Sequence, residues 1–184
     1  MKLWNSRRAF AAAAFGASLL VLAGSALGQG GKGPAKAKIV IKGDESFKPN
    51  VVITNTFRFV AGTVTVRSGG TVTMTNTTTD AHTLSIVKAS QVPRTINQLH
   101  NCSGCEAILK EHGINLEGPP TSGPPPHLVV NAGAAGFDTP GDSVVIGPKG
   151  RGGPVTFKIT ARPGTTLHFV CAFHAWMQGR FLVK

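Results

Sequence analysis

The sequence predicts an all-β domain, a sandwich or barrel of about seven or eight short strands. Runs of alternating apolar and polar residues recur along most of the chain, and this period of two is typical of half-buried strands. The 23 glycines and 12 prolines supply turns between such runs. Hydrophobic residues make up 41% and charged residues 15% of the chain, which excludes a disordered polar chain and a coiled coil.

Residues 1–28 have the features of an export signal. Its basic start contains Lys2, Arg7 and Arg8, and an uncharged, alanine-rich run follows at 9–24. Small residues at 26–28 offer a cleavage site. Residues 6–10 resemble the twin-arginine consensus, and an ordinary secretion signal with a chance arginine pair is the alternative. We therefore expect a periplasmic or otherwise extracytoplasmic protein with no stable membrane span after cleavage.

The charge of the exported part bears on its partners. Residues 1–28 contain three of the 19 lysines and arginines and none of the eight acidic residues, so the net charge of 29–184 is +8. The lysines are scattered, and the chain has no tyrosine and only 7% aromatic residues, which argues against a nucleic-acid surface. We expect a monomer that meets proteins with acidic surfaces.

The strands are predicted within one domain over 29–184, which begins with a lead-in at 29–38 rich in glycine, lysine and proline. Apolar runs follow at 39–41, 51–53, 57–59, 64–66, 72–76, 82–86, 144–146, 155–159, 167–171 and 181–183. Turn residues separate many of them, so the sandwich is expected to be antiparallel. In the run at 82–86, His82 shares a face with Leu84 and Ile86.

Residues 88–142 interrupt the strand pattern and are expected to form an insertion between two strands. A helix is predicted over about 95–112, ended by Gly113. A loop rich in glycine and proline follows, with prolines at 119–120 and 124–126. The segment has too few apolar residues for a core of its own, so we predict no separate domain.

The strongest chemical signal is the spacing of Cys171, His174 and Met177, directly after the predicted strand at 167–171. A thiolate and two imidazoles in a trigonal arrangement, with a weak axial thioether, form a blue-copper site. The second imidazole must come from elsewhere, and His82, which follows a polar loop, is the candidate. Zinc would also accept the cysteine and the histidines, but the thioether adds nothing to a zinc site.

On these residues the chain resembles the cupredoxins, the small blue copper proteins of the plastocyanin, amicyanin and pseudoazurin kind. The resemblance covers the pattern at 59–76, His82 and the run 163–183, and the ligand-loop spacing is most similar to amicyanin. It implies a Greek-key β-sandwich or barrel that holds one type 1 copper through His82, Cys171, His174 and axial Met177. It also implies an electron carrier rather than an enzyme, which uses the Cu(I)/Cu(II) couple between redox partners such as a cytochrome, reductase or oxidase.

The resemblance extends to residues around the ligands. Thr83 is expected to help hold the thiolate through its backbone N–H, and Asn76 to brace the loop before His82. His174 is the expected electron port, within an apolar collar of Phe173, Ala175 and Trp176. Two other functions stay open: copper storage or delivery, and a docking module of the same fold that acts through the insertion at 88–142.

Cys102 and Cys105 need a separate explanation, because Cys171 at the metal leaves them as an even pair. In an oxidising compartment a disulfide is the simplest interpretation. One alternative is a redox-active dithiol. The other is a second metal site for zinc or Cu(I), with ligands His100, Cys102, Cys105 and His112.

Overall fold

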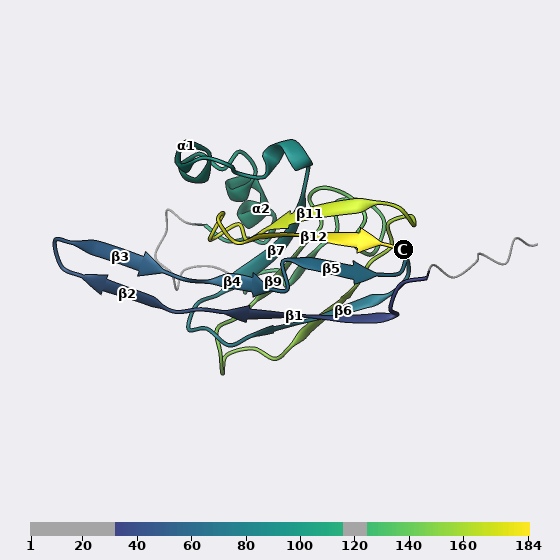
Figure 1. The fold of residues 1–184 in the computed structure, drawn as a ribbon, viewed down its shortest axis with the longest axis horizontal. Helices are drawn as coiled ribbons and strands as arrows, with labels where there is room; N and C mark the ends of the chain where they lie inside the picture. The colour runs from purple at the N-terminus through teal and green to yellow at the C-terminus, as the bar shows by residue number, and fades with distance from the viewer. Residues whose placement is uncertain (1–31, 116–124) are drawn as a thin grey trace, which may run out of the picture.

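The computed structural model describes residues 32–115 and 125–184. Two β-sheets pack face to face, and a helical segment lies against one of them (Figure 1). The predicted all-β sandwich with a partly helical insertion is confirmed. The predicted export signal at 1–28 and the loop residues 116–124 lie outside the described residues.

The strands are distributed over a four-stranded and a six-stranded sheet. The first has the order β10-β6-β1-β4, with bounds Val155–Lys158, Thr71–Asn76, Lys36–Lys42 and Arg58–Val60. The second has the order β5-β12-β11-β7-β9-β8, with bounds Thr63–Val66, Gln178–Val183, Thr166–Val170, His82–Val87, Ser143–Ile146 and Val129–Val130.

Two neighbouring strand pairs are parallel, which corrects the expectation of an antiparallel sandwich. These pairs are β1–β6 and β5–β12. The chain crosses from the four-stranded to the six-stranded sheet between β4 and β5, so strands far apart in sequence become neighbours with the same direction. Alternation within one strand carries no information about this crossover.

The core lies between the sheets and uses one side of each strand. In β1, Ile39 and Ile41 are buried while the flanking lysines are exposed. In β7 all six residues are buried, because the strand lies between β11 and β9. Leu84 and Ile86 join the core cluster, whereas Ser85 faces the helical insertion and hydrogen-bonds to Ser143. His82, the first residue of β7, therefore lies on a fully buried strand that has a neighbouring strand on each side.

The insertion contains two short helices after a 3₁₀ turn at Ala89–Gln91, so the single predicted helix over 95–112 is wrong. Helix α1 spans Ile96–His100 and α2 spans Cys105–Glu111. Asparagine, serine and glycine at 101–104 are poor helix formers, and the chain turns there. Gly113 ends α2 with φ +74°, as predicted. Among the described residues, no helix is long and apolar enough to cross a membrane.

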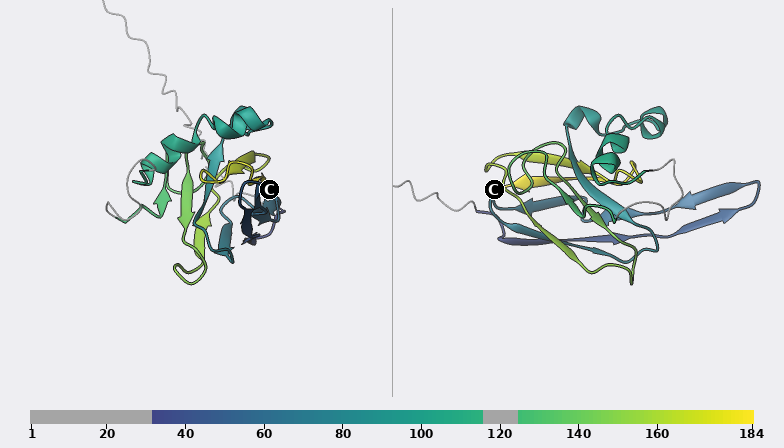
Figure 2. Two further views of the ribbon diagram at one scale, coloured as in Figure 1. Left: turned by 90° about the vertical axis from the view of Figure 1, so that its left-hand side faces the viewer. Right: turned by 180° about the vertical axis from the view of Figure 1, so that it is seen from behind.

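A separate hairpin projects from the sandwich (Figure 1, Figure 2). It consists of β2 (Glu45–Lys48) and β3 (Val52–Asn55). The sequence predicted the second strand but missed β2, because that segment has one apolar residue, Phe47, and no core to face. Phe47 and Ile53 lie opposite each other and are 74% and 73% exposed. The base of the hairpin leads to Phe57, which lies beside the candidate site.

Candidate metal centre

The structure brings together His82, Cys171 and His174, the three strong ligands expected from the sequence. His82 begins β7, and Cys171 directly follows β11, which pairs antiparallel with β7, so the two strand ends meet. The Cys171 Sγ atom lies 3.7 Å from Nδ1 of each histidine, and the two Nδ1 atoms are 3.2 Å apart. No other group of three histidine, cysteine or acidic side chains in the described ranges is arranged to hold a metal ion.

These distances suit one metal ion between the three atoms. With bonds of about 2.1 Å to imidazole nitrogen and 2.3 Å to thiolate sulfur, a trigonal ion places sulfur roughly 3.8 Å from each nitrogen. The observed 3.7 Å agrees with this spacing. A thiolate with two imidazoles is a donor set for trigonal copper. The set fits a single blue copper site.

Burial controls the protonation of the ligands in the metal-free protein. Cys171 and His82 are completely buried. Burial raises the pKa of the Cys171 thiol, and hydrogen bonds from the backbone N–H groups of Thr83, His174 and Phe173 act against that rise. Burial, and secondly the charge of His174, lower the pKa of His82 to about 4. The histidines are therefore ready as neutral ligands, and metal binding displaces a proton from the thiol.

Hydrogen bonds from the preceding loop determine which ring nitrogen of His82 carries the hydrogen. The Thr78 hydroxyl donates to Asn76 Oδ1 at 2.8 Å, so its oxygen accepts from His82 Nε2 at 2.8 Å. Each hydroxyl has one hydrogen, and this arrangement leaves His82 Nδ1 unprotonated toward the site. Asn76 Nδ2 also donates to the carbonyls of Asp80 and Gly147, and its role in bracing the loop before His82 stays a prediction. No pattern in the sequence pointed to Thr78.

We expect Thr78→Val to weaken metal binding by about 10- to 100-fold, because it removes the acceptor that orients the His82 ring. Valine keeps the shape and leaves His82 Nε2–H without its partner. Titration of Cu(I) against a competing chelator measures the change. Thr79→Val, at the exposed neighbouring position, is the matched control. Equal affinities for the two variants would contradict the role of Thr78.

Thr83 holds the cysteine and the start of its loop. Its backbone N–H points at Cys171 Sγ over 3.4 Å, and its hydroxyl oxygen accepts from the Ala172 backbone N–H at 2.7 Å. Met177 lies in the core cluster with Cys171 and is 1% exposed. The backbone N–H of Cys171 donates to the Met177 carbonyl at 2.9 Å, which closes the ligand loop. The role of Met177 as axial ligand stays a prediction.

His174 differs from His82 because its ring reaches the surface. Its side chain is 14% exposed, and its Nε2 lies 3.7 Å from Asp80 Oδ2. Trp176, itself 44% exposed, packs edge-on against the ring with a centroid distance of 5.1 Å. Phe57 packs against both histidine rings, at 5.1 and 5.2 Å. Phe57 and Asp80 were not identified from the sequence, since their role depends on the folded loops.

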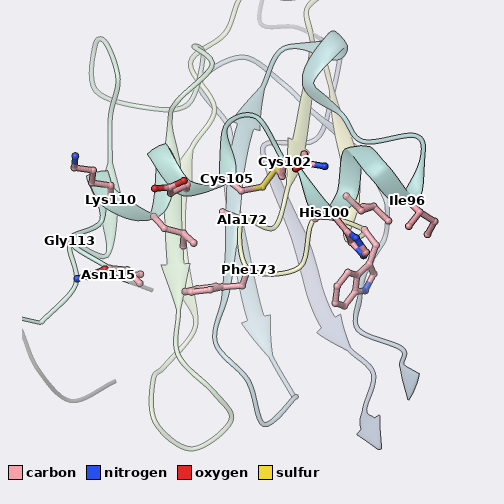
Figure 3. A pocket seen from close by; sticks show the side chains of 16 residues that line it. Ile96, His100, Cys102, Cys105, Lys110, Gly113, Asn115, Ala172 and Phe173 are labelled. Atoms are coloured by element: carbon pink, nitrogen blue, oxygen red, sulfur yellow. A yellow bond between two sulfur atoms is a disulfide. The ribbon is translucent and has the colours of Figure 1, made fainter. Parts of the chain in front are cut away.

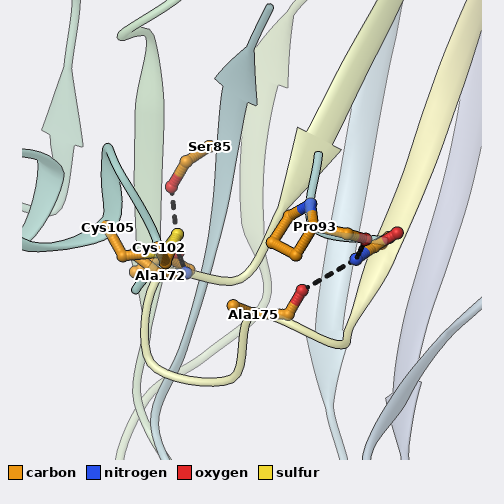
Figure 4. Close-up of a disulfide and its surroundings, with 8 residues drawn as sticks. Ser85, Pro93, Cys102, Cys105, Ala172 and Ala175 are labelled. Atoms are coloured by element: carbon orange, nitrogen blue, oxygen red, sulfur yellow. Dashed lines mark hydrogen bonds between the residues drawn. A yellow bond between two sulfur atoms is a disulfide. The ribbon is translucent and has the colours of Figure 1, made fainter. Parts of the chain in front are cut away.

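The insertion packs directly on the ligand loop. Cys102 and Cys105 form a disulfide, and Cys105 packs with Ala172 and Ala175 of the loop (Figure 4). A groove of about 1170 Å³ lies beside this contact, and it is lined by residues of both helices and by Phe173 and Trp176 of the loop. Figure 3 shows Phe173 at this groove. The predicted collar residues therefore face this groove together with the insertion.

The alternative second metal site is not formed. Its two cysteines are joined to each other. Its proposed ligand His112, directly after α2, is buried, and its ring nitrogens contact the His127 carbonyl and Ser143 Oγ. His100 ends α1 and Cys105 begins α2, with the turn at 101–104 between them. The two residues therefore do not share the one continuous helix that the sequence had predicted.

The metal-free protein is expected to lose stability in acid. The unfolded chain protonates His82 near pH 6.5 and the folded protein near pH 4, so stability present above pH 6.5 is lost as the pH falls. The free energy of unfolding should fall by about 3 kcal/mol between these values. Urea denaturation at several pH values measures this loss. The variant His82→Asn should decline less, and an equal decline would assign the loss to other groups.

No protein-family model and no curated protein matches the chain. Among solved structures, it is similar to reduced auracyanin from Roseiflexus castenholzii, with 20% identity over 82% of this chain and 97% of that chain, at a TM-score of 0.42. A purple cupredoxin from Nitrosopumilus maritimus matches with 14% identity, over 80% and 99% of the chains, at 0.40. Amicyanin from Paracoccus versutus matches with 13% identity over 81% of each chain, at 0.36. Since all these scores are below 0.5, the functional conclusions rest on the ligand geometry of this chain.

Proposed function

We propose that this chain is an extracytoplasmic type 1 copper protein that carries single electrons between redox partners. The observation that carries the proposal is the close approach of three donor atoms, Cys171 Sγ and the Nδ1 atoms of His82 and His174. Bound copper would supply the one-electron Cu(I)/Cu(II) chemistry. Met177, which closes the same loop within the core, is the proposed axial ligand.

The surrounding residues support electron transfer because they keep the ligands in one geometry. His82 is oriented by Thr78, and Cys171 is held by Thr83 and by the closed loop. The complete burial of His82 and Cys171 excludes water from two of the ligands. A site that changes little between oxidation states has a low reorganisation cost, as an electron carrier needs.

The same burial argues against copper storage or delivery. A delivery site must release its ion to a partner, whereas His82 and Cys171 are completely buried and braced by hydrogen bonds. A docking module that acts only through the insertion would have no need of an ordered ligand set.

The net charge of +8 for residues 29–184 supports acidic protein partners. We propose no enzymatic activity.

Electrons are proposed to leave through His174 and the apolar surface around it. Trp176 contacts the His174 ring and is 44% exposed, so it can pack against a docked protein. We expect Trp176→Ala to slow electron self-exchange between two copies of the chain about tenfold, the effect of losing ~1.4 kcal/mol of contact. NMR line broadening in mixtures of the two redox states measures the rate. Val129→Ala, at a 47% exposed position on β8, is the control.

The proposed function is tested by loading residues 29–184 with Cu(II) and recording absorption and EPR spectra. We expect an intense thiolate-to-copper band, a narrow copper hyperfine splitting, and reversible bleaching by a reductant. Weak colour with ordinary hyperfine splitting would overturn the type 1 assignment. A blue protein that exchanges electrons slowly with every redox agent would instead favour storage.

A further inference from the structure

The outer face of the four-stranded sheet gathers cations that are scattered in the sequence. In β1 the buried residues Ile39 and Ile41 face the core, so the residues beside them face outward, and the same alternation holds in β4 and β10. The outward positions of these three strands include five exposed cations, Lys36, Lys38, Lys42, Arg58 and Lys158. None of the eight acidic residues of the chain lies in any strand of this sheet, so its outer side is a basic face.

No side chain of the described residues neutralises this basic face. The one ion pair in the described ranges joins His174 and Asp80, so none of the five cations pairs with a carboxylate. Lys42 and Arg58 even lie opposite each other in the ladder of β1 and β4. Like charges at opposite positions destabilise a sheet, and an anion bound across them offsets that cost. The basic face is therefore suited to contact an anionic surface.

The hairpin of β2 and β3 continues the same sheet beyond the sandwich (Figure 1). β1 leads into β2, and β3 leads into β4, which pairs with β1. Lys48 is the only charged residue between 46 and 54. The apolar side chains of this hairpin tip, each more than half exposed, are Phe47, Val51, Val52 and Ile53. Since a two-stranded hairpin alone is only marginally stable in water, we expect the tip to bury these side chains against a partner.

We propose that the basic face and the hairpin tip together bind an anionic lipid bilayer. The cations contact lipid phosphates, while Phe47 and Ile53 enter the boundary between headgroups and acyl chains. The charges are spread widely, over about 20 Å along β1 alone. A bilayer matches this arrangement because it presents negative charge over a wide area and an apolar phase directly behind it. An acidic polymer would pair with the cations but leave the hairpin tip in water.

Binding through the hairpin also orients the domain. Phe57, between the hairpin and β4, packs against the rings of His82 and His174. Insertion of the hairpin tip therefore holds the copper end of the domain close to the bilayer surface. The inference goes beyond the proposed electron transfer and does not depend on it, because the candidate metal ligands belong neither to the basic face nor to the hairpin.

The test mixes residues 29–184, which contain both sheets and their core, with lipid vesicles and measures the bound fraction by flotation. Vesicles of phosphatidylcholine alone are compared with vesicles that also contain phosphatidylglycerol. We expect binding to the anionic vesicles alone, and we expect it to weaken as salt is added, because salt screens exposed charges. The metal-free protein suffices, so the result is independent of the copper spectra.

Two matched double variants test the basic face. Lys36→Gln/Lys38→Gln should weaken vesicle binding about 30-fold, since each cation near an anionic surface contributes about fivefold. Lys88→Gln/Lys110→Gln changes the net charge equally, but these exposed lysines belong to the insertion against the other sheet. That control should bind like the wild type, because charges far from the bilayer are screened. All four lysines are exposed, so both variants should fold.

A second matched pair tests the hairpin tip. Phe47→Ser removes the largest apolar side chain of the tip and should weaken vesicle binding about tenfold. Leu128→Ser changes an exposed apolar residue directly before β8, at the edge of the other sheet, and should have no effect.

The outcomes separate this inference from the proposed function. Failure of the wild type to bind anionic vesicles overturns the inference and leaves the proposed function untouched. Equal weakening by the two lysine pairs would assign the binding to net charge and overturn the role of the basic face. If Phe47→Ser binds vesicles like the wild type, and the wild type binds soluble polyglutamate as tightly as vesicles, the partner is an acidic macromolecule and the bilayer is overturned. If the vesicles bind but Cu(II) gives no blue band, the proposed function fails and this inference stands.

Discussion

Cys171→Ser is expected to abolish the intense thiolate-to-copper absorption completely. Serine is nearly the same size, but its hydroxyl does not ionise near neutral pH and cannot act as a strongly donating ligand. The two histidines remain, so weak copper binding with ordinary hyperfine splitting should persist. Absorption and EPR spectra of the variant and the wild type at equal copper loading measure the loss.

The matched control removes the thiol groups of the other two cysteines. Cys102 and Cys105 form a disulfide and contribute no thiolate, so the double variant Cys102→Ser/Cys105→Ser should keep the blue band. Its insertion is expected to loosen on the ligand loop, because Cys105 packs with Ala172 and Ala175. A blue band in Cys171→Ser, or its loss only in the double variant, would place the metal elsewhere.

Gly179→Ala is expected to destabilise the protein by about 3 kcal/mol, the upper end of the usual cost of overpacking. Gly179 of β12 lies opposite Phe169 of β11. A Cβ atom at this position would meet the Phe169 ring and, at 2.6 Å, the carbonyl oxygen of Gly62. The ring has no room to move, since Phe59 and Phe181 pack against it with centroid distances of 5.2 and 4.8 Å.

Urea denaturation of the metal-free and copper-loaded forms measures this effect. Gly153→Ala is the control, because a Cβ atom there meets nothing within 4 Å and its stability should be unchanged. Gly179 follows the ligand loop and Phe169 precedes Cys171 by two residues, so copper affinity is also expected to fall. Equal unfolding midpoints for the two variants would show that β12 can shift away from the ring.

The strands that face the core were predictable from the sequence because their pattern is local. In β6, Val72 and Met74 alternate with polar residues and are fully buried. The same reasoning failed for β2, where the hairpin pairs with itself away from the core. It also failed for the insertion, where the turn at 101–104 and the disulfide divide one expected helix into two.

The ligand loop was predictable for a related reason. Cys171, His174 and Met177 are close in sequence, so the chemistry of their side chains is visible as a spacing. His82 could be added because it opens an alternating strand after a polar loop. The residues that hydrogen-bond near these ligands were harder to predict. Asn76 and Thr83 were expected only from the resemblance to cupredoxins, and no sequence pattern indicated Thr78.

The sequence by itself therefore determined the all-β class, the core-facing strands and the identity of the copper ligands proposed here. These depend on side-chain periodicity and on ligand types within a few residues of each other. Only the tertiary structure decided the parallel pairs, the contact of the insertion with the ligand loop, and the hydrogen bonds of Ser143 to Ser85 and to His112. Ser85 and Ser143 are 58 residues apart, and Ser143 and His112 are 31 apart. Such contacts arise from the packing of β9 and α2 on β7, and no local pattern in the sequence encodes them.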